Sequence, residues 1–430
     1  MALNRTHNQC GLSELDYYNT GKIFQKDIHY DFFSVLTPKN SLVTASPILF
    51  QIDACSDFVD LGATELITTF SMLNNDGGRP VASDQVSVIN NILHSFFSQV
   101  EVSLNGKGIS HNSPNYHFRC YLENLLNYSQ QAKDTWLKSE GWYTDTKDRL
   151  DLVTNAALGH RKELFKGDDK SVTLVSRLHT DINLQKHLIP SNVDIAYTLI
   201  PARKEFVMQN YTEPHKEFSL VLEDIKMKVR KVKLTPEMTH NFERNILKQA
   251  IRIPITYVKM TTVTLSSGIT SFEKNALFSG ALPEKVIFGL VENESYTGSL
   301  TTSPYNFQTF NLSSAQFHLN GRQIPTQAIQ PNYATGEIYD AYNSLNETLG
   351  VKYADWSNGI TLDMYTKGCC LYGCDFSSGT ACFDDTSSIG ALDISLKFST
   401  PLASTTTLIL YSSMDSAVII DRYRNVICEH

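Results

Sequence analysis

The sequence has no long apolar run and no apolar segment near its beginning. Apolar residues never continue for the ~18 positions that a membrane-spanning helix needs, and residues 1–7 mix polar and apolar types. We therefore expect a protein that has no transmembrane segment and is not secreted. Disulfides persist only under oxidising conditions, and a protein that is not secreted stays in a reducing compartment. The eight cysteines are therefore expected to be thiols.

A strong excess of positive charge is also absent. The 37 Lys and Arg residues face 45 Asp and Glu residues, a net charge of -8, and neither terminus carries a basic arm. Nucleic acid is bound mainly through clustered basic side chains, so we expect no sequence-specific nucleic-acid binding. Apolar residues make up 42% of the chain, which indicates a folded globular protein instead of a disordered one.

The common catalytic motifs are missing as well. The chain contains no Gly-x-Ser-x-Gly elbow, no Gly-x4-Gly-Lys-Ser/Thr phosphate loop and no His-Glu-x-x-His zinc motif. One cysteine cluster comprises Cys369, Cys370, Cys374 and Cys382, without the paired Cys-x2-Cys knuckles of structural zinc sites. We interpret these cysteines as small buried thiols, and we expect no catalytic residue, no cofactor and no metal ligand.

A metal-dependent alternative rests on three other residues. His179 and Asp181 have the His-x-Asp spacing of an iron-binding facial triad, and His240 follows as a third ligand. Arg252 would then bind a carboxylate cosubstrate. An Fe(II)-dependent jelly-roll oxygenase using His179, Asp181 and His240 is therefore kept as an alternative, beside a carbohydrate-binding β-sandwich. Against the oxygenase, His240 follows a helix start signal, whereas the third ligand should project from a late strand.

The chain contains one pattern twice. VEVSLNGKGI at residues 100–109 returns, half the chain later, as AQFHLNGRQI at residues 315–324. In both copies apolar residues occupy every second position before Asn-Gly, and a basic residue follows directly. This pattern predicts a half-buried strand that enters a tight hairpin turn. The repetition predicts two copies of one β domain.

Helical periodicity repeats in the same order. Apolar residues at helical spacing predict a helix that begins near Pro114 and includes residues 118–126. A weaker stripe over residues 339–349 follows the second Asn-Gly turn. A further match, Val-Asp-Ile at 193–195 and Leu-Asp-Ile at 392–394, lies near the end of each half. Strand, turn, helix and late strand thus recur in one order.

Most of the remaining pattern is typical of strands. Short alternating segments separated by turn-rich loops indicate antiparallel β-sandwiches. The segments occupy residues 49–53, 66–72, 172–178, 195–199, 225–230, 251–255, 286–291, 360–364, 394–398 and 407–411.

The domain boundaries follow from these patterns. We expect an N-terminal arm at 1–40, a first β domain at 41–235, a connecting helix at 236–250 and a second β domain at 251–430. Thr235 as the N-cap and Pro236 at the first helical position predict the connecting helix. A basic run precedes it, and its alternation favours a solvated strand face over a genome-facing patch or an import signal. The run comprises Lys226, Lys228, Arg230, Lys231 and Lys233.

Several of these stretches resemble a known family. LPEKVIFGLVEN (282–293), SPYNF (303–307) and FHLNGRQIP (317–325) resemble capsid proteins of Polinton (Maverick) elements and adintoviruses, as does YHFRCYLENLLNY (116–128). The resemblance covers the chain from about residue 45 to residue 430. Ser303 and Tyr305 depart from it, because Asn and Phe are expected there.

The resemblance implies an all-β fold of two tandem eight-stranded antiparallel jelly rolls with short helices in loops. It implies a double jelly-roll major capsid protein of the lineage that includes adenovirus hexon. Such a protein is not an enzyme: it homotrimerises into pseudo-hexameric capsomers that assemble an icosahedral shell. The implied location is the virion, assembled inside the host cell in the nucleus.

Its implied partners are further copies of itself and penton or minor capsid proteins. A penton or minor capsid component is an alternative role within the same class. We expect the arm at 1–40 and the loops after each Asn-Gly turn to form lattice or trimer contacts.

Overall fold

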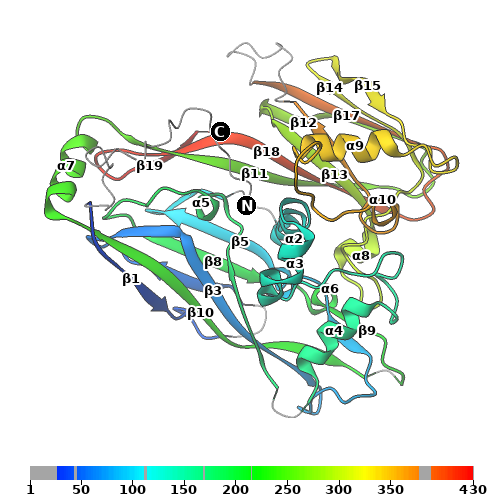
Figure 1. The fold of residues 1–430 in the computed structure, drawn as a ribbon, viewed down its shortest axis with the longest axis horizontal. Coiled ribbons are helices and arrows are strands. Elements are labelled where there is room, and N and C mark those ends of the chain that lie inside the picture. The colour runs from blue at the N-terminus through cyan, green and yellow to red at the C-terminus, as the bar shows by residue number, and fades with distance from the viewer. Residues whose placement is uncertain are drawn as a thin grey trace, which may run out of the picture.

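The computed structural model describes residues 27–42, 46–110, 114–167, 170–214, 216–376 and 389–429. Its strands form antiparallel sheets, and in the described residues no sheet contains strands from both halves of the chain. Figure 1 shows the two halves side by side, with the first half in blue to green and the second in green to red.

The first half forms two four-stranded sheets with the strand orders β1-β10-β3-β7 and β2-β8-β5-β6. A small additional sheet pairs β4 with β9. The strands of this half are β1 (Ile28–Leu36), β2 (Ile48–Ile52), β3 (Phe58–Asn74), β4 (Val86–Val88), β5 (Phe97–Leu104), β6 (Lys107–Gly108), β7 (Val172–Arg177), β8 (Ile195–Pro201), β9 (Met208–Asn210) and β10 (Phe218–Leu234).

The second half repeats this topology strand for strand. Its sheets have the orders β11-β18-β13-β16 and β12-β17-β14-β15, with β19 added beside β18. The fold is therefore a double jelly roll, as the resemblance implied. The strands are β11 (Ile251–Leu265), β12 (Ser271–Ala281), β13 (Lys285–Glu292), β14 (Leu312–Leu319), β15 (Arg322–Ile329), β16 (Leu371–Asp375), β17 (Ile389–Phe398), β18 (Thr406–Ile420) and β19 (Val426–Glu429).

Helices occupy the connections. The longest connection of the first roll, between β6 and β7, carries four of them, and the equivalent connection between β15 and β16 carries two. The helices are α1 (Ile92–Ser95), α2 (Tyr116–Asn127), α3 (Gln130–Asp134), the 3-10 helix η1 (Trp136–Glu140), α4 (Ala156–Phe165), α5 (Asp181–Leu184), α6 (Lys204–Val207), α7 (Pro236–Ile246), α8 (Asn293–Thr297), α9 (Tyr339–Thr348) and α10 (Leu362–Thr366).

The repeated Asn-Gly pair forms equivalent turns in both rolls. Asn105 and Asn320 have φ values of 47° and 50°, and the glycines that follow have values of 77° and 80°. Two successive positive φ values define the type I′ turn that suits a two-residue hairpin. Each Asn is also fixed to the neighbouring strand: its Oδ1 accepts the backbone N–H of Asp194 at 2.7 Å or of Ala391 at 2.9 Å.

The predicted match between residues 193–195 and 392–394 is wrong by two positions. Leu104 pairs with Ile195 in the first roll, and the equivalent Leu319 pairs with Leu392 in the second. Ile195 therefore corresponds to Leu392 and not to Ile394. Side chains alternate between sheet faces with a period of two, so a shift of two preserves the pattern and hides the error.

The predicted arm is also partly wrong. Residues 28–36 form β1, an edge strand that pairs with β10 in the first sheet, while residues 1–26 lie outside the described residues. Six of its nine residues are exposed, and the other three are half-buried. Because neither face of β1 is buried, its apolar and polar residues do not alternate. The sequence pattern therefore did not indicate a strand.

Residues 360–364 differ from the prediction too, because α10 occupies most of this segment. The Thr361 hydroxyl accepts the backbone N–H of Met364 at 3.2 Å and caps the helix. A Thr at the N-cap competes successfully with the short apolar alternation that follows it. Helix α7 begins at the predicted start, since Thr235 accepts the N–H of Met238 at 3.5 Å and Pro236 is the first helical residue, but it ends at Ile246 and not at residue 250.

Candidate functional site

The seam between the two jelly rolls is formed by residues of both halves of the chain. Helix α2 lies in it, below β18 and β13 in Figure 1. Its residues from Tyr116 to Leu126 are all buried, although the helix contains Arg119 and Glu123. A helix that is buried on all sides needs a partner for each of its polar groups. The partners of Arg119 and Glu123 must therefore lie within the seam.

Aromatic side chains form the apolar part of the seam. The ring of Tyr121 stacks on that of Tyr305 from the second roll, with a centroid distance of 3.9 Å and an interplanar angle of 2°. Phe118 stacks on Tyr296 at 5.5 Å in the same way. The Tyr305 hydroxyl also forms a 2.6 Å hydrogen bond with the Ser95 hydroxyl of the first roll. Aromatic pairs of this kind contribute about 0.5–1.5 kcal/mol beyond their buried area.

Charged side chains form the polar part of the seam. Arg119 contacts two carboxylates, Glu123 at 2.9 Å and Asp181 at 2.8 Å. Both carboxylates also contact the second roll: Glu123 accepts the Tyr411 hydroxyl at 3.2 Å, and Asp181 accepts the Val258 backbone N–H at 3.2 Å. Burial would raise the pKa of Glu123, but the neighbouring Arg119 and the hydrogen bond from His179 lower it to about 2.

A buried lysine adds another link between the rolls. Lys133 donates from Nζ to the carbonyl oxygens of Leu125 in the first roll and Asn358 in the second, both at 2.6 Å. Burial lowers its pKa to about 8. The lysine is thus held by two carbonyl groups from different rolls.

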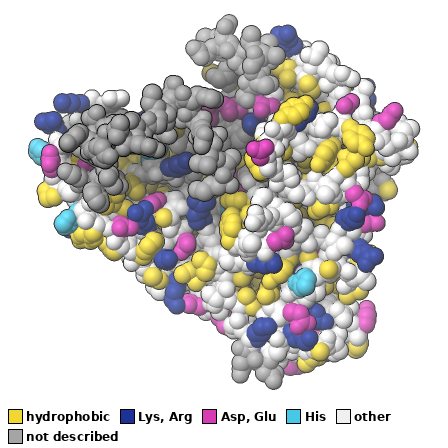
Figure 2. Space-filling model, in the orientation of Figure 1, with side chains coloured by type: hydrophobic (Ala, Val, Ile, Leu, Met, Phe, Trp, Pro, Cys, Tyr) yellow, Lys and Arg dark blue, Asp and Glu magenta, His cyan; other side chains and the backbone are white. Residues whose placement is uncertain are grey.

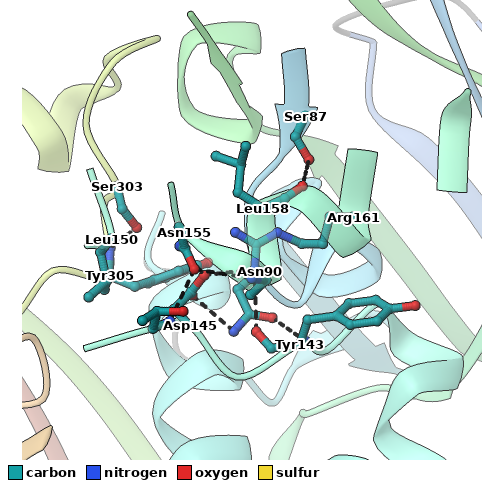
Figure 3. A network of polar contacts seen from close by, with 12 residues as sticks. Ser87, Asn90, Tyr143, Asp145, Leu150, Asn155, Leu158, Arg161, Ser303 and Tyr305 are labelled. Atoms are coloured by element: carbon teal, nitrogen blue, oxygen red, sulfur yellow. Dashed lines mark hydrogen bonds and ion pairs between the residues drawn. The ribbon is translucent and has the colours of Figure 1, made fainter. Parts of the chain in front are cut away.

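The connection between β6 and β7 also contacts the second roll between η1 and α4. Figure 3 shows Arg161 of α4 reaching Asp145, with an ion pair of 2.8 Å, while Asn155 and Asn90 donate to the same carboxylate. This network fixes the connection on the first roll. From it Asp151 accepts the backbone N–H of Ser303, in the second roll.

A cleft of about 630 Å³ opens on the seam. Side chains of both rolls line it, including Glu123, Asp181, Arg252, Tyr411 and Asp415. Glu123 and Asp181 in this lining belong to the Arg119 network that joins the rolls, whereas Arg252 pairs with Glu429 within the second roll.

The residues of the oxygenase alternative do not come together as a triad. His179 and Asp181 are buried in the seam network, where His179 Nδ1 lies 2.6 Å from Glu123 and Asp181 pairs with Arg119. His240 is exposed on α7. Arg252 pairs with Glu429 at 2.9 Å. The geometry expected for a facial iron site is therefore absent from these three predicted ligands.

The predicted cysteine cluster contains buried thiols. Cys369, Cys370 and Cys374 are buried, and Cys382 lies outside the described residues. Burial raises the pKa of Cys369 to about 12 and that of Cys370 to about 11, which keeps both as thiols at neutral pH. In the described part of the chain, the group of residues whose geometry could hold a metal ion is instead His94, Cys120 and His179.

The edge strand β1 presents a second candidate surface. Tyr30, Phe32, Phe33 and Val35 are exposed by 47%, 38%, 49% and 57%. Within the described residues the outer edge of β1 pairs with no other strand. Exposed aromatic residues on an unpaired sheet edge are typical of a surface that another chain covers.

Basic residues of β10 accompany these aromatic side chains. Lys228 Nζ lies 4.4 Å from the centre of the Phe33 ring, and Lys233 Nζ lies 5.7 Å from that of Tyr30. Hydrophobic and basic side chains are interspersed where these two strands lie in Figure 1 (Figure 2). The predicted alternation of β10 is confirmed, since Ile225, Met227 and Val229 are buried between its basic residues.

The loops after the two Asn-Gly turns have different surroundings. Asn105 donates from Nδ2 to the Arg424 carbonyl at 2.8 Å, and the loop that follows leads into α2, so this part contacts the same chain. The connection after Asn320 carries three exposed aromatic residues, Tyr339, Tyr353 and Trp356.

Sequence reasoning missed the seam residues Arg119, Glu123 and Lys133. One signal was present: Arg119 and Glu123 are separated by one helical turn on a helix that otherwise carries many apolar residues. Their partners Asp181 and Tyr411 are too distant in the sequence for any local pattern to connect them. Among the described residues, no helix combines the length and apolar character needed to cross a bilayer.

Known proteins are similar to this chain over most of its length. No family model matches the sequence. An uncharacterized Caenorhabditis elegans protein, F54H12.2, is 24% identical over 356 residues, covering 80% of this chain and 83% of the relative.

Solved structures agree in fold at much lower identity. A chain of the Sputnik virophage structure superposes with a TM-score of 0.68 at 10% identity, covering 97% of this chain and 91% of that one. The Faustovirus major capsid protein gives 0.54 at 9% identity, covering 92% and 91%. The mavirus major capsid protein gives 0.53 at 10% identity, covering 92% and 90%.

Proposed function

We propose that this chain is a major capsid protein that assembles an icosahedral shell. The observation that carries the proposal is the match to viral capsid chains over nearly the whole length of both chains, with a TM-score of up to 0.68. The repeated strand order gives this match a physical meaning. Three copies of a chain with two similar rolls present six similar units, so threefold symmetry alone fills a nearly sixfold lattice position.

In this proposal the seam is the device that turns two rolls into one rigid unit. Aromatic stacking, the Arg119 network and the Lys133 link hold the rolls in one orientation. A capsomer needs that rigidity because lattice contacts at its rim act on both rolls at once. The role is assembly without a chemical step, and the chain is proposed not to be an enzyme.

Two exposed surfaces are the proposed contacts between copies. One is the β1 edge with Tyr30, Phe32, Phe33 and Val35. The other is the connection after Asn320, which carries Tyr339, Tyr353 and Trp356. Burial of these side chains against a second copy would supply the apolar contact area that stable interfaces require.

We assign the chain to the lineage of Polinton (Maverick) elements and adintoviruses. The stretches at 282–293, 303–307 and 317–325 support this assignment. The location then follows as the virion, with assembly in the nucleus and with penton and minor capsid proteins as further partners. The proposed domain division is an arm followed by rolls at 41–235 and 251–430 joined at 236–250, with β1 added to the first roll.

The proposal is tested by the size and appearance of the purified chain. Light scattering after size-exclusion chromatography is expected to give three times 48.3 kDa. Electron micrographs of concentrated protein are expected to show hexagonal arrays or closed shells. A chain that remains monomeric at every concentration and forms no array would contradict the proposal.

A further inference from the structure

We propose that His94, Cys120 and His179 form a metal site in the first jelly roll, with Zn²⁺ as the ion that their chemistry favours. One potential ligand atom from each of these side chains lies within 4.8 Å of the others, and all three residues are buried. We call these residues the His-Cys-His cluster. It goes beyond the proposed function and does not depend on it.

The cluster joins three separate segments of the chain. His94 lies on α1, Cys120 on α2, and His179 two residues before α5. The rings of His94 and His179 meet edge to face, with a centroid distance of 4.7 Å and an interplanar angle of 86°. Two imidazoles and a thiol are soft to borderline ligands, the set that Zn²⁺ takes in proteins.

The surroundings of the cluster orient these ligands. His179 Nδ1 lies 2.6 Å from a carboxylate oxygen of Glu123, the kind of contact that fixes the ring of a zinc-binding histidine and leaves Nε2 for the metal. His94 is held between the Tyr116 hydroxyl, 3.1 Å from Nδ1, and the Ser176 hydroxyl, 3.0 Å from Nε2. The Tyr116 hydroxyl also accepts the backbone N–H of His179 at 3.2 Å, so it borders the cluster.

The charge of this region independently favours a cation. Three buried carboxylates, those of Glu123, Glu140 and Asp181, lie around the cluster. Within the described residues, Arg119 is the one Lys or Arg side chain that forms an ion pair with any of them. A buried carboxylate is costly unless a positive charge compensates it. A dication bound by one thiolate and two neutral imidazoles adds one net positive charge to this region, where the buried carboxylates outnumber the arginine.

Metal binding would remove the proton of the Cys120 thiol, as it does for thiolate ligands in general. The ion would then tie α1 and α2 to the segment before α5, next to the seam.

The direct test is the metal content and spectrum of the full-length protein. After expression with zinc and dialysis, mass spectrometry of the elements is expected to find roughly one zinc per chain. Replacement by Co²⁺ is expected to give the ultraviolet charge-transfer band of a cobalt–thiolate bond. A full-length protein without bound zinc and without this band would overturn the proposal.

Matched variants assign the ligands. C120S is expected to lower the zinc content at least tenfold and to abolish the cobalt–thiolate band. C370S, which changes a buried cysteine of the second roll, is expected to leave both unchanged. Zinc retained at the wild-type level in C120S would contradict the site. If C120S does not fold, the cobalt–thiolate band of the wild-type protein is compared with that of C370S to decide whether the cluster binds metal. Trimer formation is measured separately, so the metal site and the capsid role can each fail alone.

Discussion

The ring of Tyr121 from the first roll lies flat against the ring of Tyr305 from the second, with centroids 3.9 Å apart. The two residues come from connections on opposite sides of the domain junction. Each ring is buried, and the contact forms only when both rolls are folded and docked. Stability of the seam can therefore be measured through this pair.

Truncation of the stack should destabilise the whole chain. Y305A removes the ring and leaves a cavity beside Tyr121, with an expected loss of about 3–5 kcal/mol in the free energy of unfolding. Urea denaturation followed by tryptophan fluorescence measures this loss. Y423A removes a ring that is 70% exposed and lies outside both proposed contacts between copies, and it should change the stability by less than about 0.5 kcal/mol. Equal effects of both variants would show that the stack does not stabilise the seam.

Removal of the seam guanidinium should cost a similar amount. R119M leaves the buried carboxylates of Glu123 and Asp181 without their cation, and loss of one member of such a network costs about 3–5 kcal/mol. Thermal unfolding provides the measurement. The control is R252A, because Arg252 forms an exposed pair with Glu429 whose contribution is about 0–1 kcal/mol. An R119M protein as stable as R252A would disprove the structural role of the network.

Acidification should destabilise the chain through His117. Burial against Phe206 lowers the pKa of this histidine from 6.5 to about 3, so the unfolded chain binds a proton in a range where the folded chain does not. Stability contributed by the neutral ring is present above pH 6.5 and is lost as the pH falls from 6.5 towards 3, by up to about 1.4 kcal/mol per pH unit. Denaturation curves across this range test the effect. H117F should flatten the pH dependence, and an unchanged slope would contradict the assignment.

A charge placed on the edge strand should weaken association between copies. V35E puts a carboxylate on the proposed β1 contact without touching the core, so the chain should fold and its self-association should fall at least tenfold, about 1.4 kcal/mol. Sedimentation velocity measures the association. I427E introduces the same charge at an exposed position of β19 and serves as the control. Equal association of both variants would exclude β1 from the interface.

Local patterns were sufficient to predict the repeated part of the fold. Alternation before Asn105 and Asn320 predicted both hairpins, and the capping pair Thr235 and Pro236 predicted α7. These features depend on neighbours within one turn or one strand. β1 escaped prediction because its side chains are exposed on both faces.

The candidate sites were beyond the reach of such patterns. Arg119 meets Asp181 only because the tertiary fold brings α2 near the start of α5, and His94 meets Cys120 because α1 packs against α2. His179 was singled out by its spacing to Asp181, yet its neighbours in space are Glu123 and His94. Spacing along the chain identifies ligand types, whereas tertiary packing decides which of them share a site.

The position of α2 has a consequence for synthesis of the chain on the ribosome. The first half emerges first, and its helix carries Tyr121 and the charged pair of Arg119 and Glu123 on a surface that still lacks its cover. Tyr305 appears much later, and Tyr411 appears later still, on the long strand β18. An uncovered apolar and charged surface is prone to wrong contacts during this interval. The nascent first roll therefore has to wait, or be shielded by a chaperone, until the last long strand arrives to close the seam.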